Sequence, residues 1–152
     1  MNKIISKRFF SENVAEIVVE APLIAHSRKA GHFVIVRVDK NGERMPLTIS
    51  DADVNHGTIT LVVQRIGVSS SKLCSLEEGD SIADLVGPLG RATDIRYYGT
   101  VVCACGGVGA APMLPIAEAL KAAGNRVITV LAARNKDLLI LREQLSAVSD
   151  EV

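Results

Sequence analysis

The sequence is poor in aromatic residues, and it has no excess of positive or negative charge. Phe, Trp and Tyr together make up 3% of its 152 residues, and there is no Trp. Proteins that bind single-stranded nucleic acid stack bases on aromatic side chains, so this composition disfavours that class. The 17 Lys and Arg residues balance 17 Asp and Glu residues. A chain without net charge has no general attraction to nucleic acid or to an anionic membrane, so neither is an expected partner.

Long apolar runs are also missing. No stretch approaches the roughly 20 apolar residues that a membrane-spanning helix needs. The N-terminal MNKIISKRFF lacks the apolar centre of a signal peptide. Hydrophobic residues nevertheless make up 48% of the chain, which suffices for a packed core. We therefore expect a cytoplasmic globular protein.

Cysteine is scarce, with only Cys74, Cys103 and Cys105. An odd number of cysteines without a secretion signal does not indicate a disulfide framework. Cys103 and Cys105 would share one face of a strand, where small buried core residues are the simplest interpretation. A metal site would need further ligands at suitable spacing, and the sequence offers none, so we predict no metal ligands in this chain.

Residues 1–97 have the pattern of an all-β domain. Short β-branched runs alternate with turn signals, and Asn41-Gly42 between two such runs is a strong hairpin signal. Strands at this spacing predict a closed antiparallel barrel or a sandwich. Residues 69–76 are consistent with one short helix. The six predicted strands cover residues 3–10, 15–22, 32–38, 44–50, 58–66 and 81–90.

Residues 98–152 have a different pattern, in which strands and helices alternate. The apolar run at 99–105 predicts a strand buried on both faces, and 126–133 predicts a second strand. Helices are predicted at 113–124, ended by Gly124, and at 135–148, with Asn135 as N-cap. This order is typical of a parallel sheet. Two strands leave edges and faces uncovered, so we expect an incomplete, truncated α/β nucleotide-binding domain.

Glycine-rich turns mark three places where a ligand can approach the backbone. In CGGVGAAP, residues 105–112, glycines follow a strand and precede a helix, which suits a pyrophosphate or a purely structural tight turn. It departs from the usual dinucleotide fingerprint, because Pro112 takes the place of the third glycine and no acidic residue ends the next strand. VGPLGRA at 86–92 is equally well a loop that closes a barrel strand. QRIGVSSS at 64–71 is either a phosphate-binding turn or an ordinary N-cap.

A fourth feature is the stretch ERMPLTIS at 43–50, which places Arg44 and Pro46 in an apolar strand. Proline removes a ladder donor and is unusual inside a sheet, so this edge has a special purpose. The four motifs occur in one order over essentially the whole chain. Together they resemble the ferredoxin–NADP reductase superfamily. The phrases GERMPLTISD, VVQRIGVSSSKL, DLVGPLG and GGVGAAPMLPIA look particularly like the FAD-binding small subunit of NADH-dependent reduced ferredoxin:NADP oxidoreductase (sulfide dehydrogenase), and also like the dihydroorotate dehydrogenase electron-transfer subunit.

The resemblance implies a six-stranded antiparallel Greek-key barrel that binds FAD, followed by part of an NAD(P)-binding domain. Arg44 would pair with the FAD pyrophosphate, and the Thr48 hydroxyl would act near flavin N5. Pro46 and Leu47 would pack near the isoalloxazine, and Ile49 on the same strand is a further implied cofactor contact. The other implied FAD contacts are Val62, Val63 and Gln64, beside the ribityl and adenosine portions, and Gly67, Ser69 and Ser70, at phosphate.

The resemblance also implies a nicotinamide nucleotide as substrate. Gly106, Gly107, Gly109 and Pro112 would shape its pocket. Cys105 would lie near the contact between nicotinamide and flavin, as a catalytic residue or as a packing residue. Arg134 would touch the adenosine end, and a single arginine there slightly favours NAD(H) over NADP(H).

The implied activity is that of an electron-transfer flavoprotein subunit, which moves electrons between a nicotinamide nucleotide and an iron–sulfur centre or ferredoxin. The implied partner is a larger catalytic subunit, glutamate synthase-like or dihydroorotate dehydrogenase, in a hetero-oligomer. Family members carry a [2Fe–2S] cluster on four C-terminal thiolates, which this chain lacks. The alternatives are the dihydroorotate dehydrogenase electron-transfer subunit of pyrimidine biosynthesis, and a flavin-binding or docking module without independent catalysis. A fold whose glycines are structural only would bind neither ligand.

Overall fold

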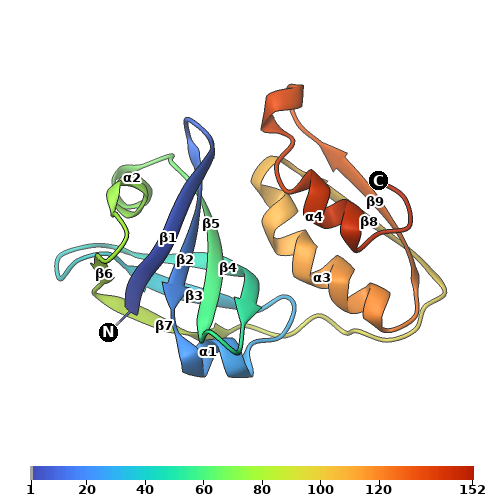
Figure 1. Ribbon diagram of the computed structural model, residues 1–152, viewed down its shortest axis with the longest axis horizontal. Helices are drawn as coiled ribbons and strands as arrows, with labels where there is room; N and C mark the ends of the chain where they lie inside the picture. Colours follow the sequence, from blue (N-terminus) through green and yellow to red (C-terminus); the bar gives the residue numbers. More distant parts are fainter. Residues whose placement is uncertain (1) are drawn as a thin grey trace.

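Seven antiparallel strands form one sheet in the computed structural model, which describes residues 2–152 (Figure 1). The strand order is β6-β1-β2-β5-β4-β3-β7. The strands are β1 Asn2–Ser11, β2 Val14–Glu20, β3 Phe33–Arg37, β4 Arg44–Asp53, β5 Thr58–Gln64, β6 Ser81–Ile82 and β7 Asp84–Leu89.

Alternating apolar residues form the core of this barrel. Ile17 on β2 and Leu61 on β5 are partners across the ladder, and both are fully buried. Each such aliphatic side chain contributes about 1.5–3 kcal/mol of burial free energy. Residues one position away point outward, as the two-residue period of a strand requires.

The barrel closes because the last predicted strand divides. Residues 81–90 were predicted as one strand, but β6 pairs with β1 whereas β7 pairs with β3. Between them the Ala83 N–H donates to the Val38 carbonyl at 3.2 Å. This segment pairs with the strands at both ends of the sheet, so neither end is left as a long free edge. The one predicted strand is thus divided in two, and seven strands replace the six predicted.

Two short helices accompany the barrel. The helix α2, Val68–Ser75, confirms the one predicted at 69–76. The helix α1, Pro22–Ser27, was not predicted. It begins with Pro22 at its first position, where the missing N–H costs nothing.

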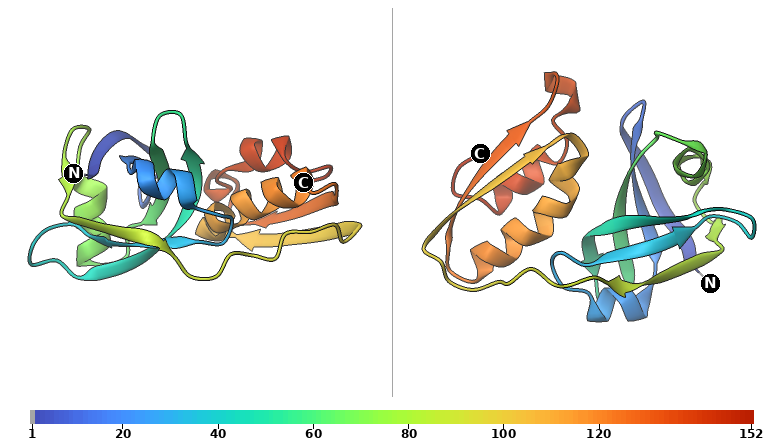
Figure 2. Two further views of the ribbon diagram at one scale, coloured as in Figure 1. Left: turned by 90° about the horizontal axis from the view of Figure 1, so that it is seen from below. Right: turned by 180° about the vertical axis from the view of Figure 1, so that it is seen from behind.

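The second part of the chain contains the parallel strands β8, Thr100–Gly106, and β9, Arg126–Ala132. The helices α3, Ala110–Ala122, and α4, Arg142–Ala147, lie on one face of this pair (Figure 2). The other face is open, with Val102 64% and Val130 52% exposed. The prediction that β8 is buried on both faces is therefore wrong, because helices cover one side only. No helix among residues 2–152 has the length and apolarity required to cross a membrane.

The helix predicted at 135–148 is interrupted. Asn135 is an N-cap, as predicted, but it caps the short 3₁₀ helix η2, Lys136–Leu138, through bonds from the Asp137 and Leu138 N–H groups. The chain then turns at Leu141, whose φ is 56°, before α4 begins. This turn buries Ile140 and Leu141 in a core, which outweighs the continuity of the helix. The helix α3 begins at Ala110, three residues before the predicted start, and Gly124 follows its end at a φ of 90°.

The two parts of the chain share this second core. Val14 and Val62 on the outside of the barrel pack with Cys103, Ala110 and other residues of the α/β part. The predicted boundary between residues 97 and 98 lies in the connection between β7 and β8, and it remains a prediction. The shared core fixes the barrel against the turn that follows β8.

Asn125 holds this connection in place. Its Oδ1 accepts from the Tyr98 N–H at 2.6 Å and the Gly99 N–H at 3.1 Å. Its Nδ2 donates to the Arg96 carbonyl at 2.9 Å and the Leu120 carbonyl at 2.8 Å. The residue is only 2% exposed, so water cannot replace these partners if the amide is removed.

We predict that Asn125→Ala lowers the free energy of unfolding by about 2–4 kcal/mol, since it strands several buried backbone groups. Chemical denaturation monitored by circular dichroism measures this change. Asn55→Ala, in an exposed turn, is the matched control and should cost less than about 0.5 kcal/mol. Equal stability of the two variants would contradict the role given to Asn125.

Candidate functional site

The strands β4 and β5 separate part of the way along the barrel. Their pairing covers the partners Asp53↔Thr58 to Ile49↔Leu61 and does not continue. Yet β4 extends back to Arg44 and β5 extends on to Gln64. Two facing edges therefore lack their ladder partner over several residues. We call this opening the strand gap.

Peptide groups line the strand gap. The Ile49 N–H donates to the His32 carbonyl, so odd-numbered residues of β4 direct their peptide groups toward β3. By alternation, the peptide groups of Pro46 and Thr48 face the gap. On β5 the Arg65 N–H donates to the Asn13 carbonyl, so the peptide groups of Val62 and Gln64 face the gap from the other side.

This geometry explains why a proline is tolerated in β4. Pro46 is the ladder partner of Ile35 on β3, but its nitrogen points away from β3. No ladder bond is lost, because this side of the strand has no neighbouring strand. The result is an edge with a carbonyl acceptor at Pro46 and an amide donor at Thr48.

The predicted site residues of β4 divide between two faces. Arg44, Pro46 and Thr48 point outward, and the Arg44 side chain is 54% exposed. Ile49 is buried in the barrel core, and Leu47 packs against that core. Their side chains are therefore directed away from any ligand in the gap. The two-residue period requires this division, which the resemblance alone did not reveal.

The same division applies to β5. Val63 is fully buried in the barrel core, and Val62 is buried in the second core against the α/β part. Only Gln64 has an exposed side chain. Val62 and Gln64 thus offer backbone groups to the gap, whereas Val63 supports the strand from inside.

The N-terminus of α2 lies beside the start of β4. The Ser69 Oγ donates to Glu43 Oε2 at 3.1 Å, and Glu43 immediately precedes Arg44. Gly67 is the N-cap of α2, and a Cβ placed on it would meet open space. Backbone N–H groups at such a helix start attract anions.

Ser70 has a different position from Ser69. Its hydroxyl accepts from the Ile66 and Gly67 N–H groups, both at 3.0 Å, and donates to the Gly67 carbonyl at 3.1 Å. The residue is buried. Its hydroxyl therefore shapes the turn, in contrast to the predicted phosphate contact.

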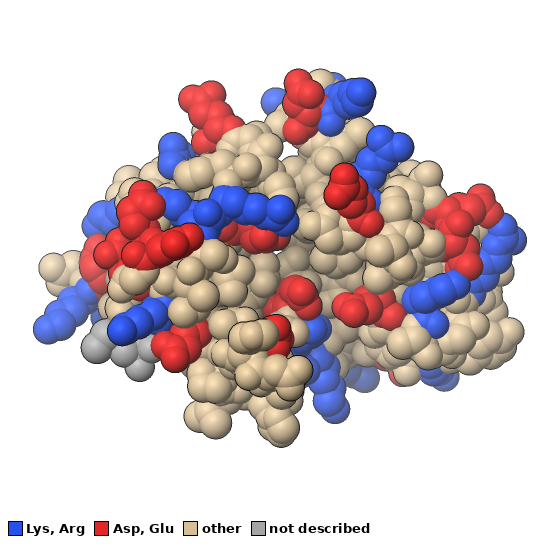
Figure 3. Space-filling model, in the orientation of Figure 1, with Lys and Arg blue, Asp and Glu red and all other residues tan. Residues whose placement is uncertain are grey.

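A hollow of about 350 Å³ lies between the β3–β4 hairpin and α2. Its polar side chains are those of Asn41, Glu43, Ser69 and Lys72. Outside it, the Arg44 guanidinium lies 3.6 Å from Asp84 Oδ2, and Arg37 also pairs with Asp84. Figure 3 shows basic and acidic side chains interspersed over the face that it presents, without a broad area of one sign.

The turn after β8 forms the other candidate site. Gly107–Gly109 make a 3₁₀ turn, η1, that leads directly into α3, and this turn contacts β5. Gly107 has a φ of 54°, and a Cβ there would enter open space. Gly106 ends β8, and Pro112 lies in the first turn of α3. This turn leaves its backbone accessible beside the barrel.

The pairing of β8 with β9 also places Arg134 near the glycine turn, at the carboxyl ends of the two strands. Gly106 and Ala132 are partners at the carboxyl ends of β8 and β9, and the exposed Arg134 follows two residues later. Ligands of parallel sheets bind at such ends.

Cys105 lies beneath the glycine turn rather than at its surface. Its Cβ is 4.0 Å from the position of a Cβ on Gly109, and its side chain packs against the second core. Burial, with a smaller contribution from Cys103, raises the pKa of the Cys105 thiol. The thiol form is a weak nucleophile, so packing is the role that this geometry fits.

The cysteines do not suit a [2Fe–2S] cluster. Cys74 is buried in the barrel core, whereas Cys103 and Cys105 lie on β8. Four thiolates are required, and no three metal-ligating side chains gather anywhere in the described part of the chain. No step is therefore assigned to an iron–sulfur centre within this chain.

The motif VGPLG is explained by packing. A Cβ on Gly87 would lie 2.7 Å from the Val34 side chain, and one on Gly90 would lie 2.8 Å from the Phe33 ring. Gly90 also has a φ of 85°. These glycines let β7 approach β3 closely, and they need no ligand.

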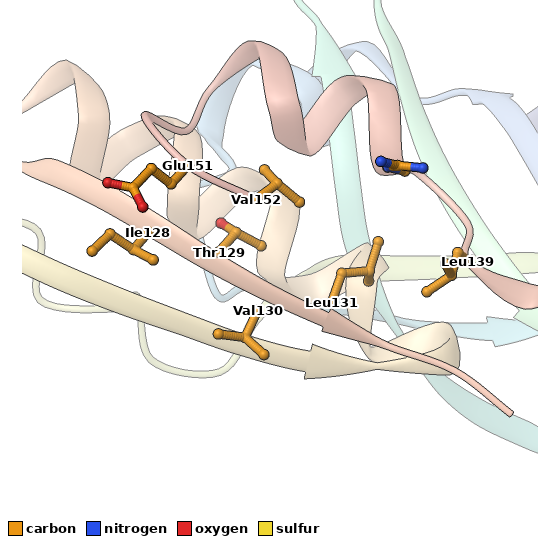
Figure 4. A pocket seen from close by; sticks show the side chains of 8 residues that line it. Ile128, Thr129, Val130, Leu131, Leu139, Glu151 and Val152 are labelled. Carbon is orange, nitrogen blue, oxygen red and sulfur yellow. The ribbon is translucent and has the colours of Figure 1, made fainter. Parts of the chain in front are cut away.

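A further hollow of about 480 Å³ lies along β9 (Figure 4). Leu131 and Leu139 lie at one end, and Thr129 and Glu151 lie at the other. The Thr129 N–H donates to the Glu151 carbonyl at 2.8 Å. The chain end thus runs beside β9 on the side opposite β8.

Sequence reasoning missed Glu43 and Asp84, the acidic residues that hold Ser69 and Arg44. Glu43 was within reach of prediction, because it adjoins Arg44 in the motif. Asp84 could not be predicted from the sequence, since only the pairing of β3 with β7 brings it beside Arg37 and Arg44.

Comparisons with known proteins agree with this fold. No family model matches the sequence. The dihydroorotate dehydrogenase B (NAD(+)) electron transfer subunit homolog of Thermotoga maritima is 41% identical over 150 residues, which are 99% of this chain and 53% of that protein. The dihydroorotate dehydrogenase B (NAD(+)) electron transfer subunit of Streptococcus pneumoniae TIGR4 is 29% identical over 95% of this chain and 59% of its own length. The chain spans about half the length of the curated relatives it matches.

Two solved structures show the same architecture. A chain of the NADH-dependent reduced ferredoxin–NADP oxidoreductase matches with a TM-score of 0.97 and 38% identity, over 100% of this chain and 55% of that one. Ferredoxin–NADP⁺ reductase from Plasmodium falciparum matches with a TM-score of 0.77 over 96% of this chain and 63% of that one, at 19% identity, which indicates the fold alone. The predicted barrel with a short parallel α/β portion is confirmed. In sequence and fold this chain is therefore similar to the dihydroorotate dehydrogenase electron-transfer subunits and to a chain of the NADH-dependent reduced ferredoxin–NADP oxidoreductase, and its fold is that of ferredoxin–NADP reductase.

Proposed function

We propose that this chain binds FAD in the strand gap and serves as an electron-transfer flavoprotein subunit. The single observation that carries the proposal is the pair of facing strand edges in which Thr48, Val62 and Gln64 present peptide groups without ladder partners. A flat heterocycle with alternating donors and acceptors along its edge suits such a gap. Bound FAD would accept a hydride and release single electrons.

The chain's own residues would bind and orient this cofactor. Arg44 is outward-facing and exposed at the start of β4, where its fork of donors suits a pyrophosphate. Ser69 and the backbone at Gly67 would hold the same group from α2. The Thr48 hydroxyl would reach the flavin ring from the strand edge. Of the other predicted contacts, Pro46 keeps its outward position, and Leu47, Ile49 and Val63 would act by supporting the strands.

A nicotinamide nucleotide would approach from the turn after β8. Gly106, Gly107 and Gly109 leave room for it, and Arg134 lies at the same sheet edge. One exposed arginine favours NAD(H) over NADP(H). The electron acceptor is then a one-electron carrier outside this chain, on ferredoxin or on a larger catalytic subunit.

Two alternatives have specific support. The relatives' names favour a partner of dihydroorotate dehydrogenase, with electrons that pass to NAD. The two-stranded sheet with an open face favours a flavin-binding or docking module that does not oxidise NADH by itself. Identification of the partner subunit distinguishes the first alternative from the proposed function. A test of NADH oxidation by the isolated chain distinguishes the second.

The first experiment is an absorption spectrum of the purified chain reconstituted with FAD, followed by NADH under anaerobic conditions. We expect protein-bound flavin bands that bleach with NADH. Bound flavin that stays oxidised would support the docking module instead. Failure to bind any added FAD would contradict the proposed function.

We expect Arg44→Ala to weaken FAD binding by about 10-fold or more, because a charge-assisted contact with the pyrophosphate is lost. Flavin fluorescence titration measures this change. Lys3→Ala removes an equal charge from exposed β1 and should leave the affinity within about twofold of the parent's. An Arg44→Ala variant that binds FAD as tightly as the parent would disprove the pyrophosphate contact.

Thr48→Val should shift the flavin midpoint potential and leave FAD affinity less changed than Arg44→Ala does, since the hydroxyl would act on the ring. Spectroelectrochemical titration gives the potential. Thr48→Ser keeps the hydroxyl and should restore the parent value. An unchanged potential in Thr48→Val would exclude this role.

A further inference from the structure

Two carboxylates hold the residues assigned to the pyrophosphate. Glu43 Oε2 accepts from the Ser69 Oγ at 3.1 Å. Asp84 Oδ2 lies 3.6 Å from the Arg44 guanidinium. Each carboxylate thus contacts a donor that the proposed function assigns to the pyrophosphate.

The surroundings explain why Glu43 lies at α2. The first turn of α2 contains no acidic residue, although the positive end of the helix dipole favours one. Glu43 reaches this helix end from the β3–β4 hairpin, at the rim of the hollow that Ser69 and Lys72 also line. Lys72 is already paired with Asp39 at 3.0 Å. Glu43 is therefore the anion that meets Ser69.

The two carboxylates differ in how firmly they are fixed. Asp84 also pairs with Arg37 across the β3–β7 ladder, so it keeps a partner when Arg44 leaves. Glu43 is an exposed residue whose carboxylate accepts from Ser69. It can swing away without breaking the barrel.

We propose that Glu43 and Asp84 are displaceable carboxylates that compete with the FAD pyrophosphate for Ser69 and Arg44. This inference rests on the proposed function of the site and adds a control on its affinity. An exposed ion pair such as Arg44–Asp84 and an exposed hydrogen bond such as Ser69–Glu43 are individually weak, so a pyrophosphate that binds both donors at once would displace the two carboxylates. The displaced carboxylates stay nearby and repel the bound anion. The chain consequently binds FAD less tightly than its Arg and Ser residues alone would allow.

Glu43→Gln tests this competition most directly. The glutamine carbonyl can still accept from the Ser69 hydroxyl, so the variant removes the charge and keeps the hydrogen bond. We expect the Kd for FAD to fall ~2- to 5-fold relative to the parent chain, as measured by flavin fluorescence titration. Glu78→Gln, at an exposed position beyond the other end of α2, removes the same charge and should leave the Kd unchanged.

Asp84→Asn gives a second, independent measurement. It should also tighten FAD binding, and the double variant should bind more tightly than either single variant. Because Asp84 also holds Arg37, thermal unfolding of this variant is measured alongside. A Glu43→Gln chain that binds FAD no more tightly than the parent, or more weakly, would overturn the proposal.

Inorganic pyrophosphate separates this proposal from the flavin assignment. Its binding is followed by amide NMR shifts at residues 67–71 in the parent and in Glu43→Gln. If no variant binds FAD but pyrophosphate binds Glu43→Gln more tightly, the flavin function is wrong and the competition stands. If pyrophosphate binds the two chains equally or binds neither, the competition is wrong.

Discussion

The separation of β4 from β5 beyond Ile49 and Leu61 is the constraint on which the rest of this structure depends. A closed barrel normally satisfies every backbone group through neighbouring strands. Here two strands diverge while each keeps its other neighbour, β3 or β2. The edges that result lack a ladder partner on one side and are held firmly on the other. A ligand with polar groups along a flat edge can replace the missing ladder at little conformational cost.

The second core joins the barrel to the α/β part beside the strand gap. Val14 and Val62 lie on the outside of the barrel, yet they are buried in one apolar cluster with residues of α3 and β8. The same contacts hold the glycine turn at residues 107–109 beside β5. Apolar packing between the barrel and the α/β part thus brings together the two surfaces proposed to bind the flavin and the nicotinamide nucleotide. Asn125 fixes the connection that makes this packing possible.

Contacts with carboxylates hold the other polar side chains of the proposed site. Arg44 and Ser69 come from different elements, and each is paired with a carboxylate from a third or neighbouring segment. Such exposed pairs are weak individually, which suits groups that must exchange partners. Cys105, by contrast, packs against the second core, and burial raises the pKa of its thiol. The proposed site would therefore rely on hydrogen bonds and displaceable charges, without a reactive thiol.

The amino-acid sequence by itself determined the two-part architecture, α2, the capping residue Asn135 and the motifs that line the gap. These features depend on local periodicity and turn chemistry. Only the tertiary structure decided the division of the last barrel strand, the interruption at Leu141 and the open face of β8 and β9, since each depends on what packs against the segment.

The same distinction applies to the site. The motif around Arg44 and Thr48 was readable in the sequence, because neighbouring residues carry it. The inward direction of Leu47, Ile49 and Val63, the internal bonds of the Ser70 hydroxyl and the approach of Asp84 to Arg44 were not readable. Strand pairing and burial set these features, and they join residues up to forty positions apart, such as Arg44 and Asp84.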